Sequence, residues 1–102
     1  MKYEFDKHGF CLNPGSRLLI NTDSFYLNIL YAEYEGRWVA ATECKIGKSF
    51  YNGVVADYNS SDSLEKAIIN KLEYLILIVK GWGKNTSLIQ EQIDKIKTPT
   101  LF

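Results

Sequence analysis

The chain of 102 residues is 46% hydrophobic and 14% aromatic, a composition that excludes disorder and supports one folded domain over residues 1–102 without help from disulfides or metal. Twelve Lys and Arg side chains balance twelve Asp and Glu side chains, so the formal net charge is zero. This balance disfavours a dedicated nucleic-acid-binding protein, because such proteins usually carry an excess of positive charge.

The N-terminal segment lacks the apolar stretch of a signal peptide, so we expect a cytoplasmic protein. Residues 3–12 mix aromatic and charged side chains around Gly9 and are predicted to form a short edge strand or an arm. Cys11 and Cys44 lie far apart in sequence and outside any CxxC motif. This spacing predicts two buried thiols rather than a disulfide, a metal site or a redox site.

Strands are predicted in the first sixty residues, separated by polar turn sequences. A short strand over residues 17–20 follows a dense turn signal. Residues 25–34 alternate, but both alternating faces are apolar. That pattern is typical of a central strand covered by a helix on one face and partly covered on the other, for which another copy of the chain is one candidate.

The next two strands are predicted from the turns between them. Gly36 can supply the positive φ that a hairpin turn requires, so residues 37–45 are predicted to return alongside the central strand. A further strand over residues 49–58 is interrupted at Asn52-Gly53, which indicates a bulge or a tight turn that splits it.

A long helix is predicted over residues 62–80. Asp62 suits the N-cap and Glu65 suits the capping-box position three residues later, after which apolar residues recur at helical spacing. Gly81 suits a left-handed helix ending against which Trp82 folds back.

The second half of this helix has no polar face, because residues 74–79 are all apolar. We therefore expect cover on more than one side. The primary interpretation is a central core helix, and the alternative is a partner-binding or self-association surface. An apolar run this short falls far below the roughly 20 residues that span a bilayer, so no membrane segment is predicted.

A short C-terminal helix is predicted to follow, with Ser87 and Gln90 as a capping box and Thr98-Pro99 at its end. The predicted fold class is therefore α+β: an antiparallel sheet of three to five strands, with the long helix packed across one face and the short helix at its edge.

The candidate catalytic residues are sparse, and they predict a protein that is not an enzyme. His8 is the single histidine, which leaves a nucleophile triad or a zinc site without the required bases or ligands. Glu33, Glu35, Glu43 and Asp57 are interpreted as solvated surface carboxylates rather than an acid–base pair. We expect no cofactor and no metal.

Aromatic side chains on the strands are the better candidates, because one layer of helix cannot bury all of them. Core packing, a protein interface and single-stranded nucleic acid are the three roles considered. The candidate partner-binding residues are Tyr26, Tyr31, Tyr34, Trp38, Tyr51 and Trp82. The nucleic-acid alternative would add three nearby cations, Arg37, Lys45 and Lys48.

The stretch that contains Leu64-Glu65-Lys66-Ala67 resembles the strand–turn–helix pattern of HicB-type antitoxins, in which strands lead through a polar cap into a helix. The resemblance implies a small partner-binding regulator of the kind common on phages and mobile elements. Leu101-Phe102 is similar to the C-terminal peptides with which bacterial proteins dock on the DNA sliding clamp, and a tail that tucks onto its own domain or a dimer mate is the alternative.

These observations predict a small non-enzymatic binding module, self-associating as a homodimer through its apolar surfaces, that inhibits or regulates a partner protein by occluding it. The runner-up hypothesis is a nucleic-acid-binding domain.

Overall fold

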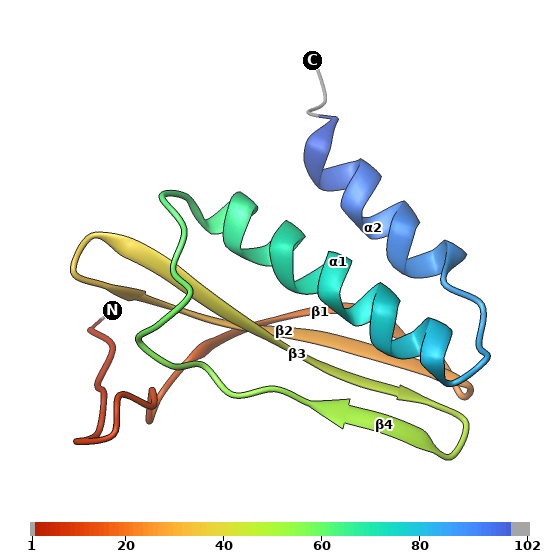
Figure 1. The fold of residues 1–102 in the computed structure, drawn as a ribbon, viewed down its shortest axis with the longest axis horizontal. Helices are drawn as coiled ribbons and strands as arrows, with labels where there is room; N and C mark the ends of the chain where they lie inside the picture. Colours follow the sequence, from red (N-terminus) through yellow and green to blue (C-terminus); the bar gives the residue numbers. More distant parts are fainter. Residues whose placement is uncertain (1, 99–102) are drawn as a thin grey trace.

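The computed structural model describes residues 2–98 and has the predicted α+β architecture (Figure 1). Four antiparallel strands follow one another as a meander in the order β1-β2-β3-β4. The strands are β1 (Gly15–Asn21), β2 (Phe25–Tyr34), β3 (Arg37–Ile46) and β4 (Ser49–Asn52), and the helices are α1 (Leu64–Gly81) and α2 (Ser87–Lys97).

The β2–β3 hairpin is the centre of the sheet, and its ten residue pairs run without interruption. Glu35 and Gly36 form the turn with φ values of 52° and 78°, the two positive values that a type I′ hairpin turn requires. The alternation of side chains in the sequence predicts both β2 and β3. Strand β3 extends one residue beyond its predicted end. The prediction of strand over 49–58 is wrong beyond Asn52, where β4 ends.

One face of the sheet packs against α1, as the ribbon shows (Figure 1). Leu27 and Ile29 from β2 are fully buried there against Leu72 and Leu75 from α1. The small side chain of Ala40 on β3 belongs to the same core cluster, so the helix can sit close to the sheet.

The other face is partly covered by the chain's own segments. The N-terminal arm forms a bridge between Phe10 and Ala56, and the Cys11 N–H donates to the Val55 carbonyl at 2.8 Å. Beneath them lies a second core cluster of Ala32, Val39, Ala41 and Val55. Residues 3–12 are therefore an arm, which is one of the two predicted possibilities.

The N-cap of α1 lies one residue later than predicted. Ser63 is the N-cap, because its Oγ accepts from the Lys66 N–H at 3.2 Å. Asp62 instead forms an exposed ion pair with the Lys66 ammonium at 3.1 Å. Glu65 lies in the first helical turn, where a negative charge suits the helix dipole.

The end of α1 also differs from the prediction, because Gly83 rather than Gly81 takes the left-handed conformation, with φ of +73°. Gly81 is the last helical residue and Trp82 is the C-cap. The Gly83 N–H donates to the Lys80 carbonyl and the Lys84 N–H donates to the Val79 carbonyl, which together form a Schellman motif.

The short helix α2 packs beside α1 through Ile89 and Ile93, which are fully buried. The predicted capping box is wrong, because the N-cap is Thr86, which makes no side-chain capping bond, and Gln90 donates to Asp94 instead. The sheet and α2 thus cover two sides of α1, while Tyr74 and Leu77 stay 54% and 65% exposed on a third.

The C-terminal predictions can be placed only in part. Helix α2 ends at Lys97, just before the predicted Thr98-Pro99 ending. Pro99, Leu101 and Phe102 lie outside the described residues. Within residues 2–98, neither helix combines the length and the apolar character needed to cross a membrane.

Candidate partner-binding site

Beyond its pairing with β4, the edge of β3 that faces away from β2 is paired at two further points and open between them. Trp38 and Ser61 exchange two backbone hydrogen bonds of 2.8 Å, and the Gly53 N–H donates to the Thr42 carbonyl at 2.8 Å. Ala40 lies midway, and because alternate residues of a strand point to the same edge, its N–H and C=O point outward too. Across residues 2–98 neither group has a hydrogen-bond partner, and the same holds for the Thr42 N–H.

These backbone groups belong to residues that are almost entirely enclosed, since Ala40 is 4% exposed and Thr42 is 3% exposed. Buried backbone N–H and C=O groups are nearly always paired, with the protein, with water or with a ligand. The open edge therefore marks a position where polar atoms from outside the chain are expected to bind.

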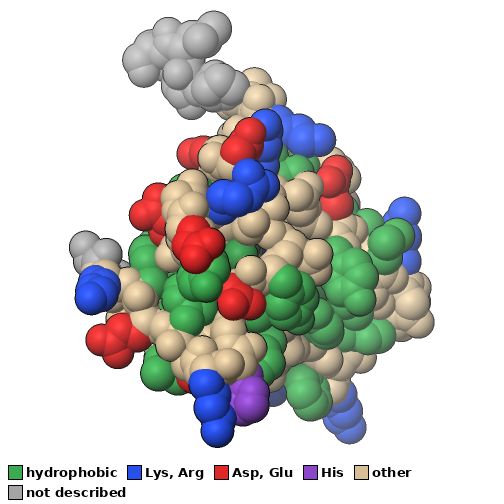
Figure 2. Space-filling model, turned by 60° about the vertical axis from the view of Figure 1, so that its left-hand side comes forward, with side chains coloured by type: hydrophobic (Ala, Val, Ile, Leu, Met, Phe, Trp, Pro, Cys, Tyr) green, Lys and Arg blue, Asp and Glu red, His purple; other side chains and the backbone are tan. Residues whose placement is uncertain are grey.

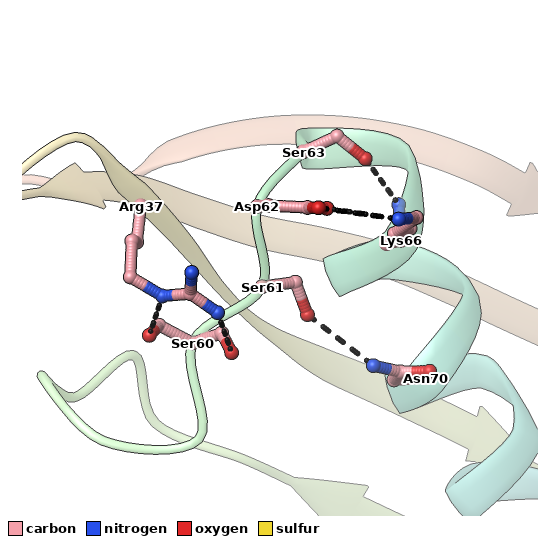
Figure 3. Close-up of polar contacts among 7 residues, drawn as sticks. All are labelled: Arg37, Ser60, Ser61, Asp62, Ser63, Lys66 and Asn70. Atoms are coloured by element: carbon pink, nitrogen blue, oxygen red, sulfur yellow. Dashed lines mark hydrogen bonds and ion pairs between the residues drawn. The ribbon is translucent and has the colours of Figure 1, made fainter.

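The opening exists because residues 54–60 leave the edge. Val55 and Ala56 are buried on the opposite face of the sheet, and the chain returns to β3 only at Ser61. Polar contacts fix the point of return (Figure 3). Arg37 donates from Nε to the Ser60 hydroxyl at 2.8 Å and from its Nη2 to the Ser60 carbonyl at 3.1 Å.

The same return point is fixed to α1, because the Asn70 amide donates to the Ser61 hydroxyl at 3.3 Å (Figure 3). Hydrogen bonds therefore fix Ser60 and Ser61, which lie at one end of the gap between β3 and the 54–60 segment.

A groove of about 220 Å³ lies in this opening, and an adjoining hollow of about 420 Å³ shares Tyr58, Lys71 and Tyr74 with it. We call the two together the edge groove. Its lining consists of Ala40, Ala41, Thr42, Tyr51, Asn52, Gly53, Val54, Tyr58, Asn59, Asn70, Lys71 and Tyr74.

Three tyrosines from three different segments line the groove. Tyr51 of β4 and Tyr74 of α1 meet edge to face, with ring centroids 6.4 Å apart, and Tyr58 extends from the 54–60 segment with 61% of its surface exposed. Burial raises the pKa of Tyr51, and the neighbouring Tyr74 and Tyr58 raise it further. The Tyr51 hydroxyl therefore stays protonated at neutral pH and can donate a hydrogen bond.

The charge of the groove comes from Lys71, which among residues 2–98 is its one charged lining residue. The ion pairs found in the described part of the chain involve Lys66, Lys95 and Lys97, and none involves Lys71. Hydroxyl groups, amides, an ammonium and unpaired backbone N–H groups make the groove rich in hydrogen-bond donors, and no carboxylate of the described residues lines it.

The six predicted partner-binding aromatics do not form one surface. Tyr31 and Trp38 lie on the α1 side, half-buried against the main core with ring centroids 6.3 Å apart. Tyr34 lies on the other face and packs edge to face with Phe5 at 4.8 Å. These side chains fix the sheet to its neighbours and offer little free surface.

The remaining three candidates lie apart from one another. Trp82 is half-buried against the main core where α1 ends. Tyr26 is half-buried on the face opposite α1, paired across the strands with Lys45. Among the six, Tyr51 alone lines the edge groove.

Arg37 is separated from the other two cations of the nucleic-acid hypothesis. Arg37 begins β3 and bonds to Ser60, whereas Lys45 lies eight residues along the same strand, a distance of ~27 Å at 3.4 Å per residue. Lys48 is in the turn that follows Lys45. On the face drawn in Figure 2, acidic and basic side chains are interspersed, and neither sign forms a continuous patch.

The carboxylates considered for catalysis do not converge with a base. Glu33, Glu35 and Asp57 are exposed, and Glu43 accepts a hydrogen bond from the Asn28 amide at 3.0 Å. His8 is exposed in the arm. No three His, Cys, Asp or Glu side chains gather as metal ligands in the part of the chain that the structure covers.

The cysteines are unpaired and lie on opposite faces of the sheet. Cys44 is buried in the main core, as predicted, whereas Cys11 is only half-buried and packs against the second cluster. Burial raises the pKa of the Cys44 thiol to about 11, so Cys44 is an inert core residue.

Sequence reasoning missed Lys71, Tyr74 and the open backbone of Ala40. Helical periodicity assigns Tyr74 to the core stretch of the helix and Lys71 to its solvated face. The signal that could have located the groove is the break at Asn52-Gly53, after which the 54–60 segment is too irregular to continue pairing with β3.

Comparison with known proteins adds no relative: no family model, no curated protein and no solved structure matches this chain.

Proposed function

We propose that this protein is a small non-enzymatic protein-binding module that regulates or inhibits a partner by holding a segment of it in the edge groove. The observation that carries the proposal is the unpaired backbone of Ala40, open to a groove lined by Tyr51, Tyr58 and Tyr74. Exposed strand edges bind peptide backbones through main-chain hydrogen bonds, and tyrosine is enriched where proteins meet.

The biological setting belongs to the same proposal. The resemblance of residues 64–67 and the preceding strands to HicB-type antitoxins supports a regulator encoded by a phage or a mobile element. Two unpaired cysteines suit the reducing cytoplasm, where we place the protein.

The proposal can be tested with a displayed library of random peptides, from which binders to the wild-type protein are selected and then measured by titration. Tyr58→Ala should abolish binding without unfolding the protein, because Tyr58 is 61% exposed. Phe50→Ala is the matched control, since Phe50 is 67% exposed and does not line the groove. Equal loss in both variants, or no selected peptide, would contradict a peptide-binding groove.

The same protein samples can distinguish the nucleic-acid alternative. Affinity for single-stranded DNA that falls steeply with salt and disappears when Lys45 and Lys48 are neutralised would favour that alternative over the groove.

We also propose that the module is a homodimer that pairs through β1. This strand lies at the edge of the sheet, and among its seven residues only Arg17 carries a charge of the kind that protects an open edge. Leu18 on this strand is 51% exposed. An antiparallel pair of identical edges is compatible with twofold symmetry.

The dimer is tested by light scattering over a concentration series. The wild-type chain should approach twice the monomer mass, and Leu18→Lys should stay monomeric because a charge at the edge opposes pairing. Leu12→Lys is the control, since Leu12 is 64% exposed but lies outside the strands. A wild-type monomer at every concentration contradicts the dimer and leaves the groove hypothesis intact.

A further inference from the structure

The edge groove is closed at both ends by the chain's own pairing. Gly53 occupies the position opposite Thr42, and Ser61 occupies the position opposite Trp38. Within residues 2–98 the free backbone groups between them are the N–H and C=O of Ala40 and the N–H of Thr42, so the free edge is little more than one residue long. A partner strand that ran along β3 would meet Gly53 on one side and Ser61 on the other.

An occupant must therefore enter the groove end-on. The terminal residue of a polypeptide satisfies this requirement, because the chain needs to leave in one direction only. An internal segment would need to enter and leave through the same opening, with a tight turn at its tip.

The donors and acceptors in the groove distinguish between the two ends of a chain. The available donors are the N–H groups of Ala40 and Thr42, the ammonium of Lys71 and the tyrosine hydroxyls, and the Ala40 carbonyl is a backbone acceptor. The amides of Asn52, Asn59 and Asn70 can donate or accept. In the described chain no carboxylate lines the groove to pair with an α-amino group. A terminal carboxylate matches this excess of donors, and its positive counter-charge is Lys71.

We infer that the edge groove binds the free C-terminal carboxylate of a partner polypeptide. The N–H of the terminal residue donates to the Ala40 carbonyl, and the carboxylate accepts from the backbone N–H groups of the open edge and from Lys71. Tyr51, Tyr58 and Tyr74 contact the terminal side chains, for which their rings favour apolar or aromatic groups. This inference rests on the proposed peptide-binding function and specifies its ligand.

The experiment uses two hexapeptide libraries of identical sequence, one with free C-terminal carboxylates and the other with C-terminal amides. Binders are selected with the wild-type chain and their dissociation constants are measured by fluorescence anisotropy. We expect the free acids to bind, and amidation of a selected peptide to weaken binding by at least about tenfold, because the amide has no charge to pair with Lys71.

Two lysine variants complete the test. Lys71→Met should weaken binding of the free acid to about the level of the amide while leaving the amide unaffected. Lys66→Met is the matched control, because Lys66 lies on the same helix but pairs with Asp62 and does not line the groove. Circular dichroism should show that both variants stay folded.

The possible outcomes distinguish recognition of the carboxylate from binding of the peptide. Amides that bind as well as acids, or a Lys71→Met variant with unchanged affinity for the acid, would overturn carboxylate recognition while peptide binding in the groove stands. The absence of binders in both libraries would refute the groove function together with this inference.

Discussion

The two glycines at the end of α1 should respond in opposite directions to replacement by alanine. Gly83 has φ of +73°, where an L-residue is destabilised by about 1–2 kcal/mol, so Gly83→Ala should lower the free energy of unfolding by about 1 kcal/mol. Gly81 is helical and exposed, and a Cβ added there would meet no atom within 4 Å. Gly81→Ala should therefore raise stability by up to about 1 kcal/mol through helix propensity.

The assay is urea and thermal denaturation of the two variants beside the wild type. One kcal/mol corresponds to roughly 4 °C in Tm for a domain of this length, so the two midpoints should separate by roughly 8 °C. If Gly81 formed the left-handed ending, as the sequence alone predicts, Gly81→Ala would be the destabilising substitution and Gly83→Ala would have no such cost. Destabilisation by Gly81→Ala would contradict the helical conformation of Gly81, and a Gly83→Ala variant as stable as the wild type would show that the Schellman motif at Gly83 does not end the helix.

Further predictions concern the helix start and the two thiols. Ser63→Ala should lower the free energy of unfolding by about 1 kcal/mol, because it removes the N-cap hydrogen bond. Asp62→Ala should change it by less than about 0.5 kcal/mol, because the Asp62 ion pair is exposed. Equal effects of the two substitutions in urea denaturation would contradict the assignment of Ser63 as the N-cap. The pKa of Cys44 is raised by burial from 9.0 to about 11, so the folded state keeps a proton that the unfolded state releases between these values. As pH rises from 9 to 11, the wild type should therefore lose about 2 kcal/mol relative to Cys44→Ala, and a constant difference across that range would refute the assignment. Under native conditions Cys11 should react first with a thiol reagent, since it is half-buried and Cys44 is buried.

Much of the fold could be predicted from the sequence because its signals are local. The alternation of β2 and β3 and the positive φ available at Gly36 depend only on neighbouring residues, and both strands lie within one residue of their predicted bounds. The apolar periodicity of α1 is equally local, and the helix lies where that periodicity predicts it.

The helix ends were harder to predict, because adjacent residues have similar capping propensities. Asp62 and Ser63 are both good N-caps, and the choice depends on which side chain reaches the Lys66 N–H. Gly81 and Gly83 are both able to adopt positive φ, and the helix continues through the first of them. One-dimensional patterns do not contain the hydrogen-bond geometry that decides between such neighbours.

The candidate site was the least predictable part, because it forms from segments that are distant in sequence. A search for aromatic residues on the strands finds Tyr51, which lines the edge groove. The same search also finds Tyr31 and Trp38, which pack against the main core. Lys71 and Tyr74 belong to the helix, and helical periodicity describes only the faces of the helix itself. Both residues face an opening because the chain departs from the edge of β3.

The opening begins at Gly53, the last residue that bonds to β3 before the chain leaves its edge. A Cβ at this position would lie 3.3 Å from the Ala41 Cβ and 3.4 Å from the Thr42 carbonyl oxygen, which is tighter than most side chains allow. At Gly53 the chain bonds to the Thr42 carbonyl and then turns away from β3. Continued pairing would have satisfied Ala40 and filled the groove with backbone. The departure of the chain from β3 after Gly53 therefore leaves the free donors and acceptor on which the proposed partner binding rests.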